Sequence, residues 1–170
     1  MKILIISSVF PPHIFGGAEI AAYNLARLLI ARGHDVSVVT SYEGDGDFDY
    51  GKRAAEGYRL YHMRVPRTHT LFSRTLIQST PRKLFWHLQD YFDPRNTRSL
   101  QQIISAIRPD HIDIQNIMGI GFNALTVLAE YNSTVSYALH DYSLACFYTT
   151  MHKKGSRCQR YHHELKRTQS

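Results

Sequence analysis

The chain is poor in cysteine and in long apolar runs. Two of its 170 residues are cysteines, Cys146 and Cys158, and two cysteines do not make the disulfide framework of a small secreted protein. No apolar run approaches the roughly 18 residues that a membrane-spanning helix needs, and the amino end shows no signal-peptide pattern. We therefore expect a cytoplasmic chain that forms one domain, or one half of a two-domain protein.

Several cofactor and partner motifs are absent from the sequence. No G-x-G-x-x-G follows the first apolar run and no acidic residue ends the second, which disfavours a dinucleotide-dependent oxidoreductase. The run Asp45-Gly46-Asp47 lacks the distal glutamate of a calcium loop, and Cys146, Cys158 and the nearby histidines lack the paired spacing of a zinc site. No DNA- or RNA-binding motif occurs. We expect no metal, no cofactor and no nucleic acid partner.

Positive charge prevails in two segments. The net charge is +6, and basic residues gather between Lys52 and Arg108 and again after Met151. In the first segment, apolar and aromatic side chains alternate with a basic set that includes Arg64, Arg67, Arg82 and Lys83. This pattern is typical of a segment lying on an anionic membrane surface. It is equally what a core of aromatic side chains with solvated basic residues looks like, and both interpretations stay open.

Apolar periodicity predicts alternating strands and helices. Lys2–Ser7 is nearly continuously apolar, as expected of a central parallel strand. A helical stripe follows over Ala18–Arg32 and should end at Gly33. Further strands are predicted at Asp35–Thr40, Tyr58–Val65, His111–Gln115 and Thr134–Leu139, and further helices at Lys83–Phe92, Pro94–Ile107 and within Gly119–Tyr131.

This order predicts an α/β fold with a Rossmann-like, doubly wound and mainly parallel sheet over residues 1–150. The stretch Ser41–Gly57 is expected to be a loop, because it is rich in glycine and aspartate. Residues 151–170 are polar and basic without an apolar period, so irregular structure is expected there.

The turn at Gly16-Gly17 is the first candidate site, because it connects the first strand to the first helix. The start of a helix presents unpaired N–H groups and the positive end of its dipole, and glycine lets an anionic ligand approach closely. Two later strands end in Gln115-Asn116 and His140-Asp141. Parallel strands end at one edge of the sheet, so we expect these residues to share a site. Tight turns and local capping are the structural alternatives for all of them.

The residues of these segments resemble glycosyltransferase family 4, over nearly the whole chain. The resemblance is carried by short motifs at Pro11-Pro12, Gly16-Gly17-Ala18-Glu19, Asn24-Leu25-Ala26, Arg32-Gly33-His34-Asp35-Val36, Arg108-Pro109-Asp110-His111-Ile112 and His140-Asp141-Tyr142. Cys146 and Cys158 resemble the paired cysteines of some polysaccharide-building members. Gln115-Asn116 departs from the family, which has histidine there.

The resemblance implies the N-terminal, acceptor-side domain of a retaining enzyme with the two-domain GT-B architecture. Such enzymes transfer a sugar from a nucleotide sugar to a glycan or lipid-linked acceptor. The nucleotide-binding C-terminal domain of the family, with its acidic E-x7-E motif, has no counterpart in this sequence. The resemblance therefore implies a chain that is inactive without a further domain or a partner chain. A non-catalytic module that binds a glycan or lipid acceptor is the alternative.

The resemblance also implies roles for individual residues. Gly16 and Gly17 would meet the donor diphosphate, and His140 and Asp141 would be catalytic, with His140 contacting the donor sugar. An acceptor or membrane side would be formed by His13, Arg64, Arg67, Arg82 and Lys83. A peripheral place on the inner face of the membrane would follow from a lipid-linked acceptor.

Overall fold

The computed structural model describes residues 1–14, 16–41, 51–63, 94–117, 119–142, 151–153 and 155–157. They divide into two compact units, Met1–Ala138 and Leu139–Ser170, and each is considered by itself. The turn that carries His140 belongs to the second unit, whereas the sequence predicted a domain over residues 1–150 followed by a basic tail.

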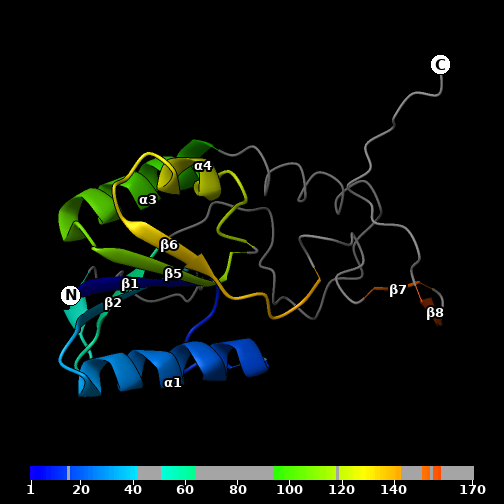
Figure 1. Cartoon of the computed structure of the whole chain (residues 1–170), viewed down its shortest axis with the longest axis horizontal. Helices are drawn as coiled ribbons and strands as arrows, with labels where there is room; N and C mark the ends of the chain where they lie inside the picture. The colour runs from blue at the N-terminus through cyan, green and yellow to red at the C-terminus, as the bar shows by residue number, and fades with distance from the viewer. Residues whose placement is uncertain are drawn as a thin grey trace. The chain divides into compact units, whose positions relative to one another are not determined.

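A six-stranded sheet forms the centre of the first unit (Figure 1), in the order β3-β4-β2-β1-β5-β6. All neighbours pair in parallel except β3 and β4. The strands are β1 (Lys2–Ser7), β2 (Asp35–Thr40), β3 (Lys52–Arg53), β4 (Arg59–His62), β5 (His111–Asn116) and β6 (Thr134–Tyr137). This arrangement confirms the predicted Rossmann-like, mainly parallel α/β fold.

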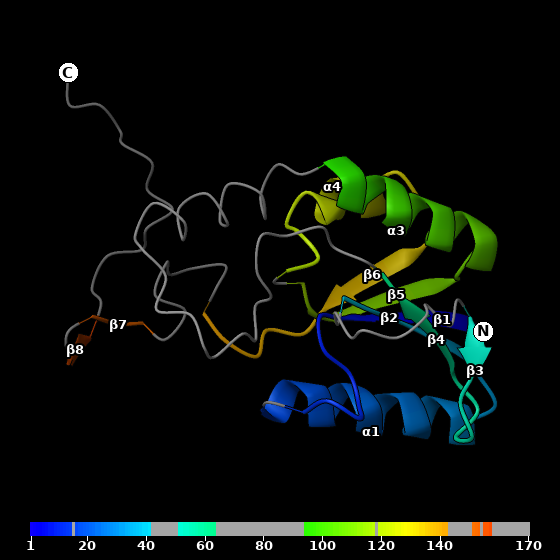
Figure 2. The same cartoon turned by 180° about the vertical axis from the view of Figure 1, so that it is seen from behind.

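Helices cover both faces of the sheet. Figures 1 and 2 show α1 (Gly17–Ala31) on one face, and α3 (Pro94–Ile107) and α4 (Ala124–Leu128) on the other. Alternate residues of β1 serve the two faces: Ile3 and Ile5 pack in the core under α1, whereas Leu4 and Ile6 pack in the core under α3 and α4. A strand covered on both faces must be apolar throughout, which explains the unbroken apolar run of β1.

The first helix begins and ends one residue before the predicted bounds, and its end is fixed by a glycine. Gly16 is the N-cap of α1, and the helix ends in a left-handed turn at Gly33, whose φ is 82°. Gly33 N–H donates to the Ile30 carbonyl at 2.9 Å and His34 N–H donates to the Leu29 carbonyl at 3.1 Å. These two bonds make a Schellman motif, which glycine favours at this position.

Two short pieces of sheet lie where the sequence predicted no strands. β3 falls inside the expected loop Ser41–Gly57 and pairs antiparallel with β4. The second unit contains a hairpin, β7 (His152–Lys153) paired with β8 (Ser156–Arg157) around Gly155, within the segment expected to be irregular. Two-residue strands show no periodicity, so a sequence pattern cannot reveal them.

Candidate functional site

At the carboxyl edge of the sheet, neighbouring strands connect to helices on opposite faces. From β1 the chain runs to α1 on one face, while the neighbouring β5 leads to α4 on the opposite face (Figures 1 and 2). Ligands of open α/β sheets bind at this point, where the winding direction reverses. The expectation that the end of β1 and Gln115-Asn116 share one edge is confirmed by the parallel register of β1 and β5.

Hydrogen bonds fix the ends of three strands at this edge. Ser8 N–H donates to the Asn116 carbonyl at 2.9 Å, and the Ser8 hydroxyl donates to the same carbonyl at 3.1 Å. The Ser8 carbonyl in turn accepts the hydroxyls of Thr40 and Ser41 at 3.1 and 3.0 Å. The register of β5 against β1 also shifts here, so that Ser7 lies opposite Asn116 and Gln115 is bulged. Bulges are enriched beside functional sites.

Ser8 and Ser41 therefore belong to this edge, although sequence reasoning assigned them no role there. The signal was present: both serines directly follow strongly apolar strands. Ser8 is fully buried and its side chain serves the backbone of β5, so it positions the edge without facing a ligand.

Neither glycine of the Gly16-Gly17 turn is required by the fold of this chain. Gly16 has an extended backbone with φ of −163°, which any residue adopts, and Gly17 is the first residue of α1. A Cβ atom at Gly17 would meet nothing within 4 Å, and one at Gly16 would meet only a Glu19 carboxylate oxygen at 3.7 Å. Both residues are exposed. The turn thus leaves open space beside the backbone, as the close approach of a ligand requires.

Glu19 lies against the same turn. Its Oε2 atom accepts a hydrogen bond from the Gly16 N–H at 2.7 Å, and its residue is 5% exposed. This is the reciprocal half of a capping box, in which an acid in the first turn reaches back to the N-cap. The carboxylate also complements the helix dipole, as expected from its position in the first turn. The N–H of Gly16 is therefore engaged, whereas helix geometry gives those of Gly17 and Ala18 no partner within the helix.

The other predicted site residues fall in different places. His13 is half-buried in the loop between β1 and α1, where its N–H donates to the Phe10 carbonyl at 3.2 Å. His140 and Asp141 are exposed in a turn of the second unit. His13 thus lies in the loop that leads to Gly16 and to the start of α1. The basic set Arg64, Arg67, Arg82 and Lys83, as well as Cys146 and Cys158, lies outside the described residues.

In the part of the chain that the structure describes, His, Cys, Asp and Glu residues form no group of three or more that could hold a metal ion. None of the helices described is long and apolar enough to cross a bilayer.

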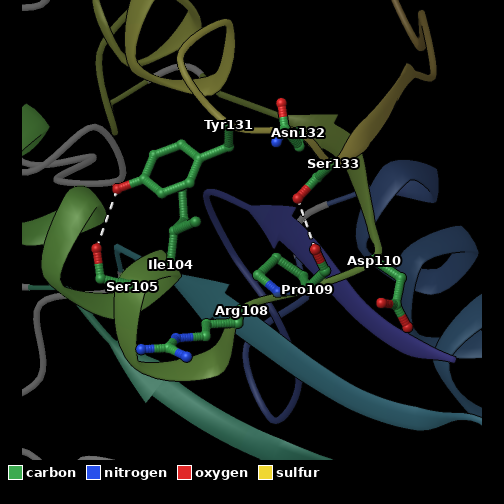
Figure 3. A pocket seen from close by; sticks show the side chains of 8 residues that line it. All are labelled: Ile104, Ser105, Arg108, Pro109, Asp110, Tyr131, Asn132 and Ser133. Atoms are coloured by element: carbon green, nitrogen blue, oxygen red, sulfur yellow. Dashed lines mark hydrogen bonds between the residues drawn. The ribbon is translucent and has the colours of Figure 1, made fainter.

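A surface hollow of about 640 Å³ opens at the opposite, amino edge of the sheet (Figure 3). It lies between the end of α3 and the turn before β6, and its lining includes Ile104, Arg108, Asp110 and Tyr131. Two hydrogen bonds join residues that line it: the Ser133 hydroxyl donates to the Pro109 carbonyl at 2.6 Å, and the Ser105 and Tyr131 hydroxyls lie 3.1 Å apart. Because these lining groups bond to one another at the amino ends of the strands, the hollow is no part of the carboxyl-edge site.

The fold and this edge define a Rossmann-like domain whose first strand leads through an open glycine turn into α1. The family model of Glycosyltransferase Family 4 matches residues 15–168. The chain belongs to glycosyltransferase family 4.

Two proteins to which the chain is similar are both considerably longer than the chain. The chain is 27% identical over 157 residues to an uncharacterized 42.6 kDa protein in the cps region of Klebsiella pneumoniae, covering 92% of this chain and 41% of that protein. It resembles the structure of sucrose-phosphate synthase from Thermosynechococcus elongatus with a TM-score of 0.63 and 15% identity, over 92% of this chain and 37% of that one. This likeness shows the fold of one half of a GT-B enzyme. The chain spans about two fifths of the length of these relatives.

Proposed function

We propose that this chain is the acceptor-binding half of a retaining glycosyltransferase. The enzyme transfers a sugar from a nucleotide-sugar donor to a glycan or lipid-linked acceptor. Family membership supports the reaction class. The observation that carries the assignment of the site is the Gly16-Gly17 turn, where two exposed glycines that the fold itself does not need precede the start of α1.

The chemistry that the turn would supply is electrostatic. When the bond between the sugar and the diphosphate breaks, negative charge develops on the departing phosphate oxygen. The N–H groups at the start of α1, with the positive end of the helix dipole, are fixed donors of the kind that stabilise such charge. They act without a metal ion, and they would share the diphosphate with groups supplied by the remainder of the enzyme.

His140 and Asp141 are proposed to serve the sugar side of the reaction. His140 would contact the donor sugar and help to shape the acceptor site, and Asp141 would orient His140 or bind an acceptor hydroxyl. Their exposure in the turn after β6 leaves both side chains accessible to a ligand. An imidazole donates and accepts hydrogen bonds near neutral pH, which suits a sugar hydroxyl.

The acceptor side is proposed to include His13 and the basic set Arg64, Arg67, Arg82 and Lys83. A basic, aromatic segment suits an enzyme that works on lipid-linked acceptors at the cytoplasmic face of a membrane. One relative is encoded in a cps region, which supports a role in polysaccharide biosynthesis.

The 170-residue chain alone is proposed to be inactive, since it spans about two fifths of its relatives. The test is sugar transfer from a panel of UDP-, GDP- and ADP-sugars, first by the intact protein, meaning this chain with the further domain or partner chain that completes it, and then by residues 1–170. Transfer by the intact protein only is expected. Transfer by residues 1–170 alone would refute the proposed inactivity. Glycan binding without transfer by the intact protein would favour the alternative, a non-catalytic acceptor-binding module.

A further inference from the structure

The start of α1 already carries a negative charge. Glu19 is 5% exposed, and its carboxylate accepts the Gly16 N–H at 2.7 Å. The ion pair of Arg59 with Asp35 at 3.0 Å lies at the amino edge of the sheet, between the first residues of β4 and β2, and does not involve Glu19. A diphosphate at Gly16-Gly17 would therefore meet two opposing effects, attraction to the helix N-terminus and repulsion by Glu19.

We infer that Glu19 limits how tightly the site holds the nucleoside diphosphate product, and so favours product release. This inference rests on the proposed function, because it assigns a regulatory part to the same turn. Glu19 also takes one N–H donor, that of Gly16, which a phosphate oxygen would otherwise use. Both effects weaken anion binding, while the hydrogen bond to Gly16 holds the turn in place.

The repulsion by Glu19 should be stronger for the nucleoside diphosphate product than for the sugar-linked donor. In the transfer, the bond from the anomeric carbon to the phosphate oxygen breaks and the oxygen keeps the electron pair. The acceptor oxygen bonds to the anomeric carbon, and its proton passes to the leaving phosphate or to water. The product thus gains a terminal phosphate group, whose second pKa near 6 leaves it more negative at pH 7 than the donor diphosphate. A neighbouring carboxylate consequently opposes the product more than the donor.

The variant that tests this inference is Glu19→Gln in the intact protein. Glutamine keeps an oxygen that can accept the Gly16 N–H but removes the charge. We expect it to bind UDP, GDP or ADP, whichever the wild type binds, about 3- to 10-fold more tightly, which corresponds to about 0.7 to 1.4 kcal/mol for the loss of one neighbouring charge. The donor sugar nucleotide should gain less, so inhibition by product should rise. Titration calorimetry and product-inhibition kinetics measure both.

Two further variants make the test decisive. Glu130→Gln removes the same charge just after α4, where the Glu130 side chain is exposed and accepts from Gln101 at 3.5 Å, and should leave nucleotide binding unchanged. Glu19→Ala removes the charge and releases the Gly16 N–H for a phosphate oxygen, but it also loses the bond that holds the turn; it should still bind the nucleotide more tightly than the wild type. If Glu19→Gln fails to fold, the nucleotide affinity of Glu19→Ala is measured in its place.

The outcomes separate the inference from the proposed function. If the wild type binds none of the three nucleotides and transfers no sugar, the proposed function falls and the inference with it. If the wild type binds one of them, but its affinity is unchanged or weaker in the Glu19 variants, the inference alone is overturned. Equal tightening by Glu130→Gln would also overturn it, because the effect would then follow net charge and not the place of Glu19.

Discussion

The Oδ2 atom of Asp110 accepts a hydrogen bond from the backbone N–H of Lys2 at 2.7 Å. The backbone of Asp110 adds two more bonds, from its N–H to the Lys2 carbonyl at 2.9 Å and from the Thr134 N–H to its carbonyl at 3.2 Å. One residue thus ties together the starts of β1, β5 and β6. The Pro109-Asp110 pair that resembles a family motif accordingly has a structural part at the amino edge of the sheet.

Replacement of Asp110 by alanine should destabilise the first unit. The Lys2 N–H would lose a charged acceptor, and we expect the free energy of unfolding to fall by about 1 to 2 kcal/mol. Asp110→Asn keeps an oxygen acceptor and should lose less. Urea unfolding measures both, with Glu130→Ala as an exposed control expected within about 0.5 kcal/mol of wild type. A loss in Asp110→Ala no larger than that of the control would contradict the assignment.

Arg108 is held in a conformation that glycine prefers. It follows the last residue of α3 with φ of 51°, and its N–H donates to the Ile104 carbonyl at 2.7 Å. A left-handed backbone costs a side-chain-bearing residue about 1 to 2 kcal/mol. Arg108→Gly is therefore expected to raise the free energy of unfolding by about 0.5 to 1 kcal/mol, partly offset by the greater freedom of glycine in the unfolded chain. Arg108→Ala retains the strain, so a stabilisation that it shares with Arg108→Gly would argue for another cause.

A side chain at Gly17 should leave the fold intact but reduce the rate of sugar transfer. A Cβ atom there meets nothing within 4 Å, so Gly17→Val is expected to leave the unfolding midpoint of the intact protein almost unchanged. The added methyl groups would occupy the space where the diphosphate approaches, and kcat/KM should fall at least about tenfold, which corresponds to a loss of about 1.4 kcal/mol of transition-state stabilisation. Gly17→Ala should show a smaller loss. Full activity of Gly17→Val would show that the donor does not come to this turn.

Tyr58 links the stability of the first unit to alkaline pH. Burial raises its pKa above the ordinary value of 10.0, and the nearby Glu56 and Tyr23 raise it further. The folded state therefore holds the phenol proton more tightly than the unfolded state. This stabilisation is fully present below pH 10 and is lost as the pH rises from the unfolded pKa through the folded pKa.

Thermal unfolding between pH 8.5 and about 11 tests this linkage. The melting temperature of the wild type should fall across the upper part of this range more steeply than that of Tyr58→Phe, which has no phenol to ionise. Tyr142→Phe is the matched control, because Tyr142 is 57% exposed. Parallel curves for the wild type and Tyr58→Phe would mean that Tyr58 does not contribute.

Most of the first unit could be predicted from the sequence because its long elements have clear apolar periods. The helix expected at Pro94–Ile107 has those bounds, and the strand expected at His111–Gln115 ends one residue later, at Asn116. The strand expected at Tyr58–Val65 is described as Arg59–His62. β3 could not be predicted, since its pairing depends on a turn in which Gly57 N–H donates to the Ala54 carbonyl at 2.9 Å.

The candidate site could be located from the sequence but not described. The glycine pair before a helix indicated where an anion would approach, and parallel strands indicated which residues share that edge. The buried position of Glu19 and its bond to Gly16 depend on how the loop closes, which no spacing of residues reveals. The same holds for the bulge at Gln115 and for the bonds that converge on Ser8.

The central position of β1 has a consequence for the order of folding. Its partner β2 follows one helix later, so β1, α1 and β2 can form a local unit while the chain is still being synthesised. Its other partner is far away in the sequence, as the separation of 108 positions between Lys2 and Asp110 shows. Until β5 arrives, one side of β1 offers unpaired backbone groups that any extended strand can join. Nascent chains that stop before Asn116 should therefore be the ones most exposed to misassembly and proteolysis.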